Sequence, residues 1–144
     1  MADQLQVDIV TPDGRAFEGE ARGVKAPGIK GSFEVLRNHA PMIAAFGIGQ
    51  LVVKTQDAYE DLTISDGRIE FATSGGFLEV LDNRVIVLAE TVEPASDIDT
   101  ERAEAAEQRA LQRLRESTSP DEREEAQEAL DRARNRLRVS MGGV

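Results

Sequence analysis

The stretch FLEVLDNRVIVL, residues 77–88, holds two apolar runs separated by a short polar loop. Phe77–Leu81 and Val85–Leu88 are rich in residues that favour strands, and Asp82-Asn83-Arg84 between them is typical of a tight turn, so the pattern predicts a β-hairpin. Similar runs, bounded by turn residues, recur towards the N-terminus at residues 5–9, 51–53, 62–64 and 69–71. A strand about every 8 to 12 residues is the spacing of antiparallel all-β domains, so this spacing favours an antiparallel sandwich or barrel.

The chain of 144 residues changes character near Pro94. Residues 1–94 hold 32 large apolar residues and ten of the twelve glycines, whereas residues 95–144 hold 8 large apolar residues and 8 alanines. The first part has enough apolar side chains for a core, and the second is helical in composition but poor in apolar surface. The sequence therefore predicts an α+β protein of two domains: a β-sandwich or barrel at 1–93 and a helical domain at 94–144.

The second domain is predicted to be an antiparallel two-helix hairpin. Small and apolar residues recur at helical spacing and form one stripe on each helix: Ala103, Ala106, Ala110 and Leu114 on the first, and Ala126, Leu130, Ala133, Leu137 and Met141 on the second. Ser96 or Asp97 is expected to cap the first helix. Ser119, Pro120 and Glu122 predict a capping box at the start of the second.

The predicted hairpin is physically weak. Its stripes consist mostly of alanine, and the segment has only four leucines, each of which contributes roughly 1.5–3 kcal/mol when buried. Helices of this length are marginal in water without tertiary contacts. The hairpin therefore needs the first domain, a ligand or a partner, and a segment with two arrangements of similar free energy can act as a switch.

Charge and composition exclude several classes of function. The net charge is −10, which argues against nucleic acid as a partner and against a basic membrane patch. The absence of cysteine and the single histidine exclude thiolate chemistry and histidine-rich metal sites, so no metal is expected. No apolar run is long enough to span a bilayer, and the N-terminus does not look like a signal peptide. We expect a cytosolic protein without direct membrane insertion.

Residues with obvious catalytic chemistry are scarce. His39 lies in the turn-like stretch Asn38-His39-Ala40-Pro41, for which a structural or interface role is the simpler interpretation. No serine has the surroundings of a nucleophile elbow, and Gly28-Ile29-Lys30-Gly31 lacks the consecutive Gly-Lys-Ser/Thr of a phosphate loop. Two alternatives stay open from these residues alone: a free-standing β-sandwich binding module with a helical tail, and a small hydrolase that uses His39 with Glu34.

Three stretches together resemble the epsilon subunits of bacterial F-type ATP synthases, and they span nearly the whole chain. They are Gly31–Met42 (GSFEVLRNHAPM), Ser74–Val80 (SGGFLEV) followed by Val85–Glu90, and Ile98–Ala103 (IDTERA). The first departs from the family pattern at Glu34, Arg37 and Asn38, where glycine or proline is common. Asparagine tolerates the left-handed backbone that a glycine position often needs.

The resemblance implies a non-catalytic rotor subunit that needs no cofactor. In the family, the strand domain grips the gamma subunit and rests on the ring of c subunits, on the cytoplasmic face of the bacterial inner membrane. The helical hairpin of the family can fold compactly or extend up the stalk towards the alpha and beta subunits. The extended form restrains ATP hydrolysis while it allows synthesis. The expected subunit contacts fall on two segments: Ile29, Lys30, Gly31 and Ser32, and His39, Ala40, Pro41 and Met42.

The resemblance also implies that ATP can act as a regulatory ligand of the compact hairpin. Members that bind ATP share an Ile/Leu-Asp-x-x-Arg-Ala pattern, further arginines on both helices and a preceding acid. The matching residues are Glu93, Ile98, Asp99, Arg102, Ala103, Arg109, Arg132 and Arg136. Guanidinium groups that converge when the helices pair are well shaped for phosphate. The simpler alternative is that these arginines belong to solvated helix faces.

Overall fold

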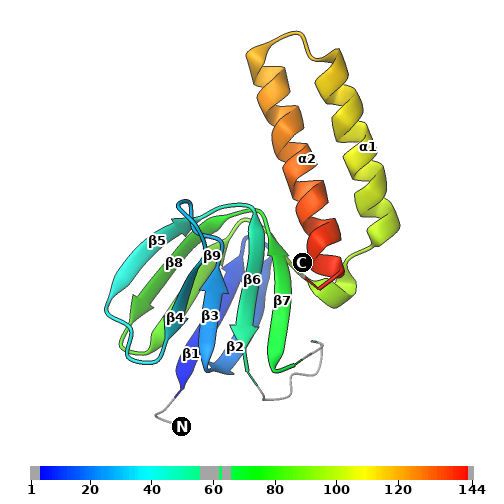
Figure 1. Ribbon diagram of the computed structural model, residues 1–144. Helices are drawn as coiled ribbons and strands as arrows, with labels where there is room; N and C mark the ends of the chain where they lie inside the picture. The colour runs from blue at the N-terminus through cyan, green and yellow to red at the C-terminus, as the bar shows by residue number, and fades with distance from the viewer. Residues whose placement is uncertain (1–3, 56–61, 63–65, 143–144) are drawn as a thin grey trace.

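The structure, a computed structural model, describes residues 4–55, 62 and 66–142. It has a strand domain and a two-helix hairpin that stands at one end of it (Figure 1). The described residues contain ten strands: β1 (Leu5–Thr11), β2 (Gly14–Ala21), β3 (Gly23–Ala26), β4 (Phe33–Leu36), β5 (Met42–Phe46), β6 (Gly49–Lys54), β7 (Arg68–Thr73), β8 (Gly76–Leu81), β9 (Arg84–Ala89) and β10 (Val92–Pro94). A single 3₁₀ turn, η1 (Ala95–Asp97), leads into α1 (Thr100–Glu116) and α2 (Pro120–Ser140).

The strands form two five-stranded sheets, so of the predicted sandwich or barrel the domain is a sandwich. The first sheet has the order β2-β1-β9-β8-β5, and the second has the order β10-β7-β6-β3-β4. All neighbouring strands are antiparallel except β1 and β9, which are parallel. β1 and β9 lie near opposite ends of the sandwich sequence. The local alternation of apolar residues within each strand does not indicate that these two strands pair. The strand predicted at 62–64 falls largely outside the described residues.

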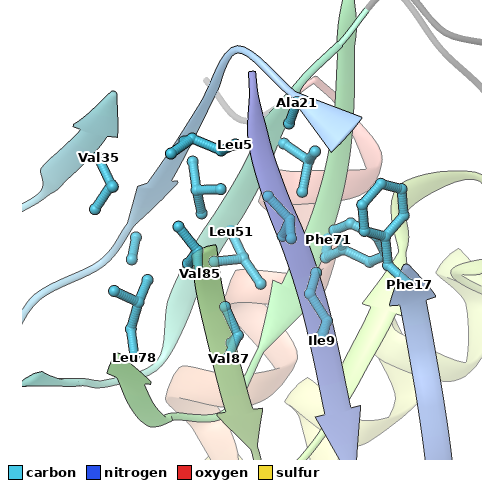
Figure 2. Packing of buried hydrophobic residues seen from close by; sticks show 14 of the residues in the cluster. Leu5, Ile9, Phe17, Ala21, Val35, Leu51, Phe71, Leu78, Val85 and Val87 are labelled. Carbon is cyan, nitrogen blue, oxygen red and sulfur yellow. The ribbon is translucent and has the colours of Figure 1, made fainter. Parts of the chain in front are cut away.

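The core lies between the two sheets, where alternate side chains of both inner faces meet. Figure 2 shows Phe17 and Phe71 at one side of this core and Leu78 and Val85 at the other. Phe71 is fully buried and is the largest such side chain. Among the described residues, this core therefore consists of sandwich residues, and no residue of α1 or α2 belongs to it.

Two tight connections lie at the end of the sandwich opposite the hairpin. Asp82 and Asn83 both have positive φ, as a two-residue type I′ turn requires, and they join β8 to β9. Asn38 has φ 65°, which confirms the left-handed backbone considered for it. Its backbone N–H donates to Asn83 Oδ1 at 2.6 Å, so the loop after β4 is fixed to the β8–β9 turn.

The helices begin at side chains that accept backbone N–H groups. Asp99, not Ser96 or Asp97 as predicted, caps α1, because η1 occupies residues 95–97 and delays the helix start. At α2 the prediction is confirmed: Ser119 Oγ accepts from the N–H of Glu122 at 3.2 Å. Glu122 in turn accepts from the N–H of Thr118 at 3.1 Å, which completes a variant of the capping box.

The two helices pack along their alanine stripes, as predicted. Ala103 and Ala110 of α1 and Ala126, Leu130 and Ala133 of α2 are buried. The prediction for Met141 is wrong, because this side chain is 73% exposed at the end of α2. Val139 is buried instead, since the last turns of α2 face the sandwich as well as α1.

A small contact area joins the hairpin to the second sheet near β7. Ile98 and Val139 pack on Ala72 of β7 in a cluster separate from the main core. Arg136 of α2 pairs with Glu93 of β10, with Nε to Oε1 at 2.9 Å and Nη2 to Oε2 at 3.3 Å. The hairpin is thus held by a few apolar contacts and polar links, not by a continuous core.

Candidate functional site

A cavity of about 800 Å³ lies where the hairpin meets the edge of the second sheet. Both helices line it, together with β7 and β10, the residues Ser74 after β7 and Thr91 before β10, and the β1–β2 turn. This volume is within the range of roughly 300–1,000 Å³ that is common for small-molecule sites. The lining residues are Asp13, Ala72, Thr73, Ser74, Thr91, Val92, Glu93, Arg102, Ala106, Arg109, Ala110, Arg113, Ala129, Arg132, Ala133, Asn135 and Arg136.

The cavity reverses the charge of the protein locally. Five arginines line it, against two acidic residues, although the chain as a whole carries a net charge of −10. Guanidinium groups are permanent cations with planar sets of donors that match phosphate and carboxylate oxygens. The cavity therefore suits an anion with several oxygen atoms.

Helix geometry places the arginines on facing surfaces. Arg102, Arg109 and Arg113 follow each other at +7 and +4 on α1, so they share one face of that helix. Arg132 and Arg136 are four residues apart on α2. The small side chains of Ala106, Ala110, Ala129 and Ala133 leave the space between these two rows open.

The arginines differ in how they are bound. Arg136 donates through Nε and Nη2 to the two carboxylate oxygens of Glu93, in a pair that is about two-thirds buried. Among the residues that the structure describes, the ion pair of Arg132 is a long contact of 4.0 Å with Glu128 at the surface. Within the part of the chain that the structure describes, Arg102 and Arg109 make no ion pair. Their side chains therefore have donors available for a bound anion.

The structure brings together five of the eight residues predicted for ATP, since Glu93, Arg102, Arg109, Arg132 and Arg136 all line the cavity. The other three do not line it. Asp99 Oδ1 accepts from the N–H of Arg102 at 3.1 Å and so sets the start of α1. Ile98 and Ala103 are buried in packing contacts. These three residues position the helix that carries Arg102.

The sequence prediction missed several lining residues. Arg113 follows Arg109 by one helical turn and could have been found from that spacing. Asp13, Thr73 and Asn135 carry no such signal, because they come from three elements that only the fold brings together. Asn135 is the most buried polar residue of the hairpin, at 5% exposure.

Asn135 links α2 directly to the sheet. Its Nδ2 donates to the carbonyl oxygen of Gly49 at 2.7 Å and to that of Thr73 at 3.4 Å. Gly49 and Thr73 face each other at the end of the β6–β7 ladder. A Cβ on Gly49 would lie 2.4 Å from Pro27 Cβ, so this close approach requires glycine. The amide of Asn135 thus donates to two carbonyl oxygens at the end of the β6–β7 ladder.

The two predicted contact segments lie at opposite ends of the sandwich. Ile29, Lys30, Gly31 and Ser32 form the exposed β3–β4 loop, at the hairpin end. His39, Ala40 and Pro41 lie in the connection from β4 to β5 at the other end, and Met42 is the first residue of β5. His39 Nδ1 lies 2.7 Å from the carbonyl oxygen of Ala40 and does not line the cavity. The two segments therefore do not form one surface.

The outer face of the first sheet carries a group of exposed apolar side chains. Ile43 of β5 is 72% exposed, Phe77 of β8 58% and Leu88 of β9 54%. Phe77 faces Leu88 across the β8–β9 ladder and Ala45 across the β5–β8 ladder. Exposed apolar side chains that adjoin each other often mark a protein interface. We call Ile43, Ala45, Phe77 and Leu88 the apolar face.

The described residues hold neither a metal-binding cluster nor a helix that could span a membrane. Residues 4–55, 62 and 66–142 contain no group of three or more histidine, cysteine, aspartate or glutamate side chains placed to hold a metal ion. None of the helices within these ranges is long and apolar enough to cross a membrane.

Two family models match consecutive parts of the chain. Residues 4–95 match the β-sandwich domain of the ATP synthase delta/epsilon chain, and residues 96–141 match its long α-helix domain. Together they cover almost the entire chain.

Curated relatives match over nearly their full length. The ATP synthase epsilon chain of Salinibacter ruber is 68% identical, with 100% of this chain and 97% of the relative covered. The epsilon chain of Desulforamulus reducens is 40% identical over 97% of this chain and 99% of its own length. That of Syntrophomonas wolfei is 42% identical over 94% and 93%.

Solved structures show the same fold at low sequence identity. A chain of the Euglena gracilis mitochondrial ATP synthase aligns with a TM-score of 0.77 and 21% identity, covering 96% of this chain and 82% of the other. A chain of the Tetrahymena thermophila mitochondrial ATP synthase central stalk and c-ring assembly aligns with a TM-score of 0.71 and 12% identity, covering 94% and 96%.

Proposed function

The chain belongs to the delta/epsilon chain family of ATP synthases, and on that premise we propose that it is a non-catalytic rotor subunit of the central stalk. In this role it couples rotation of the c ring to ATP synthesis in the catalytic head. It works at the cytoplasmic face of the bacterial inner membrane, where it is held by other subunits and requires no cofactor. Its gamma partner and the c ring carry the torque, and its sandwich provides the rigid part that binds them.

The apolar face is the surface that we assign to the gamma subunit. Its side chains project from three adjacent strands of a rigid sheet, and burial of a large apolar side chain contributes roughly 1.5–3 kcal/mol. The exposed β3–β4 loop, with Ile29 and Lys30, is assigned to the c ring, as the family resemblance implies.

A charged residue introduced into the apolar face tests whether this face binds the gamma subunit. Phe77→Asp should abolish co-purification with the gamma subunit, because a buried unpaired carboxylate is costly. Met141→Asp is the matched control, since Met141 is also exposed and apolar but lies at the end of α2. Equal loss of binding in both variants would contradict the assignment.

The hairpin is the regulatory part of the proposed function. Its compact position depends on the small cluster around Ala72 and on the links from Glu93 and Asn135. An element held this weakly can leave the sandwich and extend along the stalk towards the alpha and beta subunits, where it restrains ATP hydrolysis. A ligand that binds only the compact form keeps the hairpin away from that position.

We assign ATP as this ligand, and the arginine-lined cavity is the observation that carries the assignment. Two arginine rows on separate helices converge only when the hairpin is compact, so an anion held by both rows stabilises that form. A triphosphate has more oxygens and more charge than a diphosphate, so it should engage more of the arginines. ATP should therefore bind more tightly than ADP.

Isothermal titration of the full chain with ATP and with ADP tests the site. We expect one ATP per chain, weaker ADP binding, and loss of binding in Arg132→Ala. Arg138→Ala is the matched control, because Arg138 lies on the same helix, is exposed and does not line the cavity. The assignment fails if ATP does not bind at millimolar concentration, or if Arg138→Ala reduces binding as much as Arg132→Ala.

Removal of the hairpin tests the restraint of hydrolysis separately. The sandwich has its own core, so a chain that ends after Ala95 should still assemble with gamma. The assembled complex should then hydrolyse ATP faster than the complex with the full chain, at an unchanged amount of bound subunit. An unchanged rate of hydrolysis would contradict the restraint but would leave the rotor role intact.

A further inference from the structure

Asn135 has an unused hydrogen-bond acceptor in the cavity. The side chain is 5% exposed, and its Nδ2 donates to the carbonyl oxygens of Gly49 and Thr73. A carbonyl oxygen can only accept, so the nitrogen of the amide must face the sheet, and this fixes the orientation of the group. Among the described residues, Oδ1 of Asn135 has no donor.

The neighbouring polar groups of the sandwich are already satisfied by one another. Thr73 Oγ1 donates to the carbonyl oxygen of Thr91 at 2.9 Å and accepts from the N–H of Gly75 at 3.3 Å. Thr91 Oγ1 donates to Ser74 Oγ at 2.7 Å, and Arg136 occupies both carboxylate oxygens of Glu93. Of these lining groups, Asn135 is therefore the one with a free acceptor that is also nearly buried.

The two sides of the cavity therefore offer opposite hydrogen-bonding groups. The arginines of the hairpin can only donate, whereas Asn135 presents an oxygen on the side of the sheet. Phosphate oxygens are acceptors, so they are attracted to the arginines and repelled by Oδ1. The part of a nucleotide that lies at Asn135 must be one that carries a donor.

The surroundings of Asn135 favour the base over the ribose. Thr73, to which Asn135 is bonded, faces Val92 in the β7–β10 ladder, and the adjacent Ala72 is buried. Ala72 and Val92 both line the cavity and give this part of it an apolar surface. A flat apolar ring with one donor at its edge fits such a surface better than a sugar with several hydroxyl groups.

We infer that Asn135 is a specificity-determining residue of the nucleotide site, whose Oδ1 accepts a hydrogen bond from the exocyclic amine of adenine. The inference rests on the proposed ATP site and adds to it the selection of the base. Guanine carries a carbonyl oxygen at the same ring position, which would place two acceptors against each other. The same amide also holds α2 on the sheet, so recognition of the base and docking of the hairpin use one side chain.

A comparison of three nucleotides on two proteins tests the inference. The dissociation constants of ATP, GTP and the triphosphate of purine riboside, which has hydrogen in place of the amine, are measured by titration for the unmodified chain and for Asn135→Ala. The unmodified chain should bind ATP about 10-fold more tightly than the purine riboside triphosphate and about 100-fold more tightly than GTP. In Asn135→Ala, ATP and the purine riboside triphosphate should bind equally.

The ratio of two affinities removes the effect of hairpin docking. Both nucleotides need the compact hairpin, so any loss of docking in Asn135→Ala weakens them by the same factor. Gln127→Ala is the matched control: it removes an exposed amide of α2 outside the cavity and should leave the ratio near 10, as estimated for one hydrogen bond. If Asn135→Ala binds neither nucleotide measurably, the same ratio is measured for Asn135→Asp, which keeps an acceptor towards the cavity and should keep the preference for ATP. Its second oxygen faces the carbonyl oxygens of Gly49 and Thr73 and weakens docking, but by the same factor for both nucleotides.

The outcomes separate this inference from the proposed function. Equal binding of ATP and the purine riboside triphosphate to the unmodified chain overturns the role of Asn135 and leaves the ATP site intact. A preference that is unchanged in Asn135→Ala, or lost in Asn135→Asp, overturns it as well. Failure of the unmodified chain to bind ATP overturns both the site and the inference.

Discussion

The sandwich and the hairpin bury their apolar side chains in different ways. The sandwich core holds large residues such as Phe71, Leu5 and Ile9, which are fully enclosed between two sheets. The hairpin interface holds mainly alanines with one buried leucine, Leu130, and its contact with the sheet is a cluster of a few residues. Since burial free energy follows apolar area, the sandwich should remain folded under conditions in which the hairpin opens. A rigid body with a detachable arm is what the proposed rotor and regulatory roles require.

The largest expected effect is on the stability of the sandwich core. Phe71→Ala removes the largest fully buried side chain and should lower the free energy of unfolding by about 3–5 kcal/mol in urea titration. Phe77→Ala is the matched control on the next strand along the chain. Because Phe77 is exposed, its loss should change the free energy of unfolding of the isolated chain by less than about 0.5 kcal/mol. Similar costs for both variants would show that the core is not where the stability lies.

Removal of a buried leucine from the hairpin tests whether the hairpin opens independently of the sandwich. Leu130→Ala should destabilise the hairpin by about 2–3 kcal/mol, because Leu130 is the largest buried side chain between the helices. Native-state hydrogen exchange should show faster exchange in α1 and α2 and unchanged exchange in the core strands. Equal acceleration in both domains would mean that they unfold as one cooperative unit, and the detachable arm would then be excluded.

A smaller effect is expected at the start of α2. Ser119→Ala removes the oxygen that accepts from the N–H of Glu122 and should cost about 1 kcal/mol of hairpin stability. Ser119→Asp keeps an acceptor at the same position and should retain most of this stability. Helix content measured by circular dichroism during heating distinguishes the two variants. The expectation fails if Ser119→Asp loses as much as Ser119→Ala.

The smallest effect concerns the link between the two domains. Glu93→Gln breaks the pair with Arg136 and should weaken docking of the hairpin by about 0.5 kcal/mol, less at high salt because the pair is partly exposed. Glu128→Gln is the control, since its contact with Arg132 is long and lies at the surface. Exchange rates of α2 amides at low and high salt provide the measurement. A loss that does not depend on salt would contradict an electrostatic link.

Much of the candidate site could be predicted from the sequence, because helical spacing fixes which residues share a face. Arg132 and Arg136 lie four apart, and Arg102 follows its capping residue Asp99 by three, so their placement follows from local geometry. The exact helix start could not be predicted in this way. The 3₁₀ turn at residues 95–97 is stabilised by docking of the neighbouring Ile98 on the sheet, and this moved the cap from Ser96 or Asp97 to Asp99.

The sequence by itself determined the division into a strand part and a helical part and the arginine rows, since each depends on composition or on the local period of side chains along one strand or helix. It left a sandwich and a barrel both open, and the two separate sheets of the tertiary structure decided between them. Only the tertiary structure decided the parallel pairing of β1 with β9 and the docking of the hairpin on the edge of the second sheet. The contacts of Asn135 with Gly49 and Thr73 join residues 86 and 62 positions apart, and Met141 is exposed where periodicity alone would bury it. Such contacts depend on how whole surfaces fit together, and no local pattern records that fit.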